Sequence, residues 1–146
     1  AKPDFVDNVV PAEEACGIEI NEAFLGSCNN GRIEDLRVGA EIIKGKKYLI
    51  KYVFSLFGKP DHLSSGIKRR SDRYLHGSWR DCYEPELQCM LGKLQGVIGE
   101  NEVLISTGTR NFKGRAGHPS SKVYLGSAAT VTASAIAGKI ALPSEI

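Results

Sequence analysis

Residues 24–37 read FLGSCNNGRIEDLR, which is the clearest structural signal in the chain. The apolar start of this stretch follows Ile18 and Ile20 and is typical of a buried strand. Glycine and asparagine in residues 26–31 predict a tight turn. Apolar residues then recur at helical spacing, namely at Ile33, Leu36, Ala40 and Ile43. A strand, a turn and a helix in this order predict a βα unit.

The rest of the chain continues this alternation. Further elements are expected as strands at 47–57 and 102–106, an exposed basic helix at 61–74, and an Ala-rich helix that Ser127 caps and that ends near Gly138. Residues 107–119 are rich in glycine and predict a long loop. Asn30 is predicted to cap the first helix, and Gly45 to end it. We therefore expect an α/β fold, a three-layer domain with a mostly parallel sheet.

Composition bounds the class of protein. The chain has 146 residues, 42% of them hydrophobic and 25% charged, which predicts one globular domain over 1–146. A net charge of +2 gives no support to nucleic-acid binding, and the least polar stretch, 123–142, is too mixed for a membrane span. The polar start predicts no signal peptide. Four scattered cysteines favour a reducing compartment, so we expect the cytoplasm, or an organelle matrix in a eukaryote.

Cys28 lies between the end of the expected strand and the start of the expected helix. Backbone N–H groups at a helix N-terminus stabilise an anion and lower the pKa of a thiol. Ligands also gather at the carboxyl ends of parallel strands. Cys28 could therefore be a nucleophile or a metal ligand. A small apolar cysteine in a tight turn remains an equal alternative.

Residues 109–118 read TRNFKGRAGH. Arg110 and Arg115 carry guanidinium groups that bind carboxylates or phosphates through two parallel hydrogen bonds, and Asn111 lies between them. The glycines allow the backbone to approach a small ligand closely. These features fit an anion-binding loop, but composition alone favours the alternative, a flexible basic surface loop.

Together the two motifs resemble the aconitase superfamily. Residues 24–37, followed by KGKK at 44–47, are similar to that family's GSCTNGRIEDLR…KGRK segment. Residues 105–119, which read ISTGTRNFKGRAGHP, are similar to its STTNRNFxGRxGHP loop. Within the superfamily, the likeness is to the large subunits of the isopropylmalate dehydratase and homoaconitase group. It covers nearly the whole chain, with the motifs in the same order.

The resemblance implies an aconitase domain-3-like fold, the third and cluster-carrying domain of such a subunit. Members are hydro-lyases of amino-acid biosynthesis that isomerise a hydroxy di- or tricarboxylic acid by dehydration and rehydration at a [4Fe–4S] cluster. Cys28 matches one cluster ligand, and Cys89 matches a second after a slip of one residue. The loop residues Arg110, Arg115 and Asn111 match the substrate-binding positions.

Two consequences concern partners and activity. The resemblance implies that the remaining large-subunit domains and a small swivelling subunit complete the site around a small carboxylic acid, with no nucleic acid and no membrane involved. The isolated domain is then part of an enzyme and is not competent alone. Because the family's C-x-x-C pair has no counterpart here, the alternative is a cluster-free carboxylate-binding or assembly module on the same fold.

Overall fold

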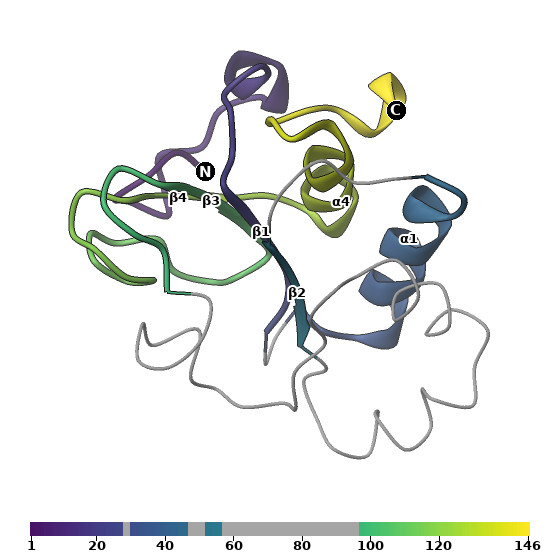
Figure 1. Ribbon diagram of the computed structural model, residues 1–146, viewed down its shortest axis with the longest axis horizontal. Helices are drawn as coiled ribbons and strands as arrows, with labels where there is room; N and C mark the ends of the chain where they lie inside the picture. Colours follow the sequence, from purple (N-terminus) through teal and green to yellow (C-terminus); the bar gives the residue numbers. More distant parts are fainter. Residues whose placement is uncertain (28–29, 47–51, 57–96) are drawn as a thin grey trace.

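A four-stranded parallel sheet organises the domain (Figure 1). The computed structural model describes residues 1–27, 30–46, 52–56 and 97–146. The strands are β1 (Glu22–Gly26), β2 (Tyr52–Leu56), β3 (Val103–Ser106) and β4 (Lys122–Leu125), in the order β2-β1-β3-β4. Every neighbouring pair is parallel. The predicted α/β fold with a parallel sheet is confirmed.

One face of the sheet is covered by two helices, α1 (Ile33–Ile43) and α4 (Ala128–Ala137), which lie on the same side in Figure 1. Ala23 and Leu25 point to this face because side chains alternate along a strand. A single apolar core joins the sheet to both helices through Leu25, Ile105, Leu36, Ile43, Val131 and Ala135. This shared core packs β1 against α1 and α4, and the end of β1 lies close to the start of α1.

The opposite face has a different cover. Phe24 and Leu104 point to it and pack with Ile98, Ala116 and Val123. Ala116 belongs to the segment that connects β3 to β4, so a loop covers this face in the part of the chain that the structure describes. A three-layer domain requires helices here, and the predicted helix at 61–74 lies outside the described residues.

The helix ends show which capping predictions hold. Gly45 follows α1 with φ +75, the left-handed conformation that ends many helices, as predicted. Ser127 caps α4, and its Oγ accepts a hydrogen bond from the Thr130 N–H at 3.2 Å. Gly138 ends α4 with φ +70. The prediction that Asn30 caps α1 is wrong, because the N-cap is Arg32 and no side chain makes the capping bond.

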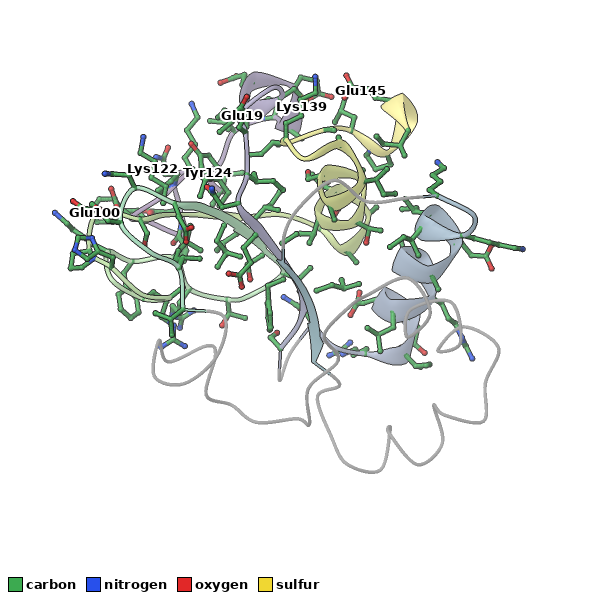
Figure 2. The ribbon with its side chains drawn as sticks, in the orientation of Figure 1. Glu19, Glu100, Lys122, Tyr124, Lys139 and Glu145 are labelled. Atoms are coloured by element: carbon green, nitrogen blue, oxygen red, sulfur yellow. The ribbon has the colours of Figure 1, made fainter. Side chains whose placement is uncertain are left out.

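Three short elements were not expected from the sequence, namely β4 and the 3-10 helices η1 (Ala12–Ala15) and η3 (Pro143–Glu145). The segment before β1 meets the segment after α4 in an antiparallel bridge between Glu19 and Lys139, whose side chains lie at the same end of the molecule (Figure 2). Within the described residues, no helix has the length and apolar character needed to cross a membrane.

Candidate functional site

The ends of β1 and β3 are joined at the carboxyl edge of the sheet. The Thr107 hydroxyl accepts a hydrogen bond from the Gly26 N–H at 2.9 Å and donates one to the Gly26 carbonyl at 2.7 Å. The Thr107 N–H donates to the Phe24 carbonyl at 3.0 Å. Thr107 is buried, so these bonds are shielded from water. They fix the starting points of both sequence motifs relative to each other.

The turn after β1 is held by polar side chains on both sides. Ser27 is buried and adopts φ +115, a conformation that residues with a Cβ rarely adopt. Its Oγ accepts the Asn30 N–H at 3.0 Å. Asn30 Nδ2 donates to the Thr107 carbonyl at 2.5 Å. Asn30 therefore ties the turn to the loop after β3. Cys28, the predicted ligand or nucleophile in this turn, lies outside the described residues.

Both predicted arginines belong to the loop that begins at Thr107. Arg110 is exposed, and its Nη1 donates to the Thr109 carbonyl at 2.8 Å. Arg115 is half-buried, and its guanidinium lies 5.4 Å from the centre of the Phe112 ring. A cation over an aromatic face is stabilised by a weak attraction that leaves the guanidinium edges free to bind an anion. The structure brings the two cations into one loop.

This loop is fastened at its far end to Ile98. The Ile98 N–H donates to the Ala116 carbonyl, and the His118 N–H donates to the Ile98 carbonyl, both at 3.0 Å. A Cβ on Gly117 would overlap the carbonyl oxygen of Ile98. Only glycine allows this close backbone approach. The loop is thus an ordered anchored segment, which argues against the flexible surface loop that the composition had left open.

Asn111 occupies a different environment from the arginines. Its side chain is 1% exposed, and its Nδ2 donates to the backbone carbonyls of Lys2 at 2.6 Å and Phe5 at 3.2 Å. Its Oδ1 is buried without a hydrogen-bond partner. Both amide hydrogens are therefore used within the chain, and direct contact of Asn111 with a substrate stays a prediction.

The structure leaves the predicted cluster ligands undescribed, because Cys28 and Cys89 both lie outside the described residues. Cys16 is the one cysteine within them, and its Sγ donates to the Ala12 carbonyl at 3.4 Å. Among the described residues, no three Cys, His, Asp or Glu side chains gather as metal ligands. The part of the chain that the structure describes therefore supplies no cluster site.

Among the described residues, the most strongly shifted pKa belongs to a carboxyl at the amino edge of the sheet. Glu22 begins β1 and shares the loop-covered face with Phe24. Burial raises the pKa of its carboxyl to about 8, and the charge of Glu102 adds to the increase. Glu102 Oε2 accepts the Gly99 N–H at 2.6 Å. Because ligands gather at the carboxyl edge, this pair is separate from the candidate site.

Sequence reasoning missed Thr107 and the N-terminal residues as parts of the site. Thr107 directly follows a strand in a parallel sheet, and that position alone could have marked it. No local pattern could have shown that Lys2 and Phe5 contact Asn111, because the partners are separated by 109 and 106 positions in the sequence.

The described residues thus form a parallel α/β domain whose anchored loop carries two arginines and begins at the carboxyl edge of the sheet. Comparison with known sequences gives the particular family. The chain belongs to the Aconitase family (aconitate hydratase), whose profile matches residues 5–138. This finding confirms the resemblance to that family inferred from the two motifs.

The chain is similar to the large subunits of two kinds of enzyme. It is 40% identical over its full length to a probable methanogen homoaconitase large subunit of Methanosarcina mazei, of which it covers 37%. It is 41% identical over its full length to a 3-isopropylmalate dehydratase large subunit of Hydrogenobaculum sp., of which it covers 35%. With the dehydratase large subunit 1 of Methanopyrus kandleri, identity is 42% over 98% of this chain and 34% of that protein. The chain thus spans about a third of the length of these relatives.

Proposed function

We propose that the chain is one domain of the large subunit of a hydro-lyase of the isopropylmalate dehydratase or homoaconitase type. The observation that carries the proposal is the anchored loop with Arg110 and Arg115, in a chain that relatives with these names match over its whole length. In this function the chain would bind a hydroxy di- or tricarboxylic acid that is isomerised by dehydration and rehydration. The remaining large-subunit domains and a small subunit would complete the site.

The two arginines would bind and orient the substrate. The exposed Arg110 offers N–H groups in the fork geometry that matches a carboxylate. Arg115 offers a second fork whose direction is limited by the Phe112 ring beneath it. Two separate carboxylate contacts would fix the substrate in one orientation, as a dehydration that must choose between neighbouring carbons requires.

A [4Fe–4S] cluster would supply Lewis-acid chemistry toward the substrate hydroxyl, and Cys28 and Cys89 are the residues that the family resemblance offers as its ligands. Reconstitution of the chain with iron and sulfide without oxygen tests this part. We expect thiolate-to-iron charge-transfer absorption that Cys28→Ser weakens and Cys16→Ser leaves unchanged. Unchanged absorption in Cys28→Ser would exclude Cys28 as a ligand. No such absorption in the unchanged chain would favour the cluster-free carboxylate-binding module, which the absence of a C-x-x-C pair also supports.

Calorimetric titration with 3-isopropylmalate and with citrate tests the anion-binding part. We expect Arg115→Ala and Arg110→Ala each to weaken binding about tenfold or more, because a charge-assisted hydrogen bond contributes about 1.5–3 kcal/mol. Arg37→Ala removes the same charge from the exposed side of α1 and is the matched control. Equal weakening in all three variants would reduce the effect to net charge and contradict the assigned roles.

A further inference from the structure

Asn111 makes three hydrogen bonds to the N-terminal segment, defined here as residues 1–9. Its side-chain Nδ2 donates to the backbone carbonyls of Lys2 and Phe5. The backbone carbonyl of Asn111 accepts the Asp4 N–H at 3.1 Å. The side-chain nitrogen is assigned without ambiguity, because both of its neighbours are acceptors and an oxygen in its place would be repelled.

The N-terminal segment is itself fixed to the sheet. The Ala1 nitrogen donates to the Leu125 carbonyl at 2.6 Å, and the Leu125 N–H donates to the Ala1 carbonyl at 3.0 Å. The Lys2 N–H closes the segment by donating to the Asn8 carbonyl at 2.9 Å. A residue that binds this segment is therefore connected to the end of β4 through the backbone.

Asn111 lies immediately after Arg110 and four residues before Arg115 in the same loop. The Arg115 N–H donates to the carbonyl of Phe112, the residue that follows Asn111, at 2.9 Å. A displacement of Asn111 would consequently move both guanidinium groups. The Ile98 contacts hold only the far end of the loop, so Asn111 supplies the anchor between the arginines.

We propose that Asn111 is a positioning residue, which fixes Arg110 and Arg115 by binding the N-terminal segment instead of touching the substrate. The proposal rests on the proposed function only in taking these arginines as the carboxylate-binding groups. The burial of Asn111 supports it, as does the use of both its amide hydrogens by backbone carbonyls of that segment. The segment then becomes part of the binding machinery without contacting the ligand.

The test breaks the connection between Asn111 and the N-terminal segment from each of its two sides. Asn111→Ala removes the side-chain donors. Asp4→Pro removes the Asp4 N–H and is incompatible with the φ of +78 at that position, whereas Asp4→Gly keeps the N–H and accepts this φ. Asn21→Ala is the control for lost stability, because Asn21 Oδ1 accepts the Val103 N–H at the opposite edge of the sheet. Asp4 is exposed, so its variants keep the core intact.

Two measurements are made on each variant of the chain. Calorimetry with citrate gives the dissociation constant, and hydrogen exchange without ligand reports on the backbone of residues 107–119. We expect Asn111→Ala and Asp4→Pro each to weaken binding about tenfold and the double variant to be no weaker than either, since both break one connection. Exchange in 107–119 should rise in these variants and stay unchanged in Asp4→Gly and Asn21→Ala.

Three results separate the possibilities. Weakened binding in Asn111→Ala but unchanged binding and exchange in Asp4→Pro would show direct substrate contact and overturn the proposal. Additive losses in the double variant would overturn it as well. If the unchanged chain binds no citrate, the assignment of the arginines fails, and the exchange data alone then decide whether Asn111 anchors the loop.

Discussion

The two faces of the sheet are built by different means. The helical face packs α1 and α4 on Leu25 and Ile105, with small residues that let the backbones approach closely. The loop-covered face packs Phe24 and Leu104 under Ile98 and Ala116, with backbone hydrogen bonds in place of helices among the described residues. The helical face is held by apolar packing, and the position of the arginine loop on the other face depends on a few polar contacts.

The largest effect is expected from a deletion in the core of the helical face. Leu25 is fully buried against both helices, so Leu25→Ala should cost about 3–5 kcal/mol of unfolding free energy through lost burial and the cavity that remains. Denaturant unfolding measures the loss. Where the variant is folded, its dissociation constant for citrate should equal that of the unchanged chain. A selective loss of binding would mean that the two faces are not independent.

The next effect is expected where the loop crosses Ile98. Gly117→Ala would place a Cβ onto the Ile98 carbonyl, and the backbone must move, which costs about 3 kcal/mol and displaces Arg115. Both stability and citrate binding should fall. Gly114→Ala is the matched control, because its φ of +75 is strained but its Cβ would meet nothing closer than 3.9 Å. That control should cost only about 1 kcal/mol. Similar losses in both variants would contradict the steric argument.

Glu22 makes the loop-covered face sensitive to pH. The folded pKa of about 8 lies above the ordinary value of 4.5, so the folded chain retains a proton that the unfolded chain releases. This stabilising contribution is fully present below pH 4.5 and is lost as the pH rises through 8. The unfolding free energy should fall by about 3 kcal/mol between pH 6 and pH 9.

Glu22→Gln removes this titration and should flatten the dependence, which thermal melts across the pH range would show. Glu102→Gln removes the neighbouring charge and should lower the pKa of Glu22, so the loss of stability moves to lower pH. This change should be smaller than that of Glu22→Gln, because burial is the larger cause of the raised pKa. An unchanged pH profile in Glu22→Gln would assign the dependence to another group.

The parts of the fold that were predicted correctly are those that local sequence determines. The apolar repeat of α1, the glycine after it and the Ser127 cap each depend on residues within a few positions of one another. The strand β4 was missed because four residues with a Lys and a Tyr carry no distinct pattern, and their pairing with β3 alone defines them.

The same distinction applies to the site. The arginines were identified from residue type and from the glycines around them, which is local information. The bond of Asn30 to the Thr107 carbonyl spans 77 positions, and the expected helix cap was therefore wrong. A capping residue and a loop anchor have the same sequence signature, a polar side chain next to a helix start, and only the fold decides which acceptor lies nearer.

The smallest effect is expected at the cap of α4, and it tests the comparison from the helical side. Ser127→Ala removes the acceptor for the Thr130 N–H, which should cost about 1 kcal/mol. Urea unfolding measures this loss, with Ser144→Ala, an exposed serine after the helix, as the control. Ser127 follows β4, and the N-terminal segment binds Leu125 at the end of that strand. Fraying of α4 could therefore disturb Asn111 through this segment. Citrate binding should nevertheless stay unchanged, because Leu125 lies before Ser127 in the sequence and its bonds to Ala1 do not depend on the cap. Weakened binding would show that the helical cover also holds the arginine loop in place.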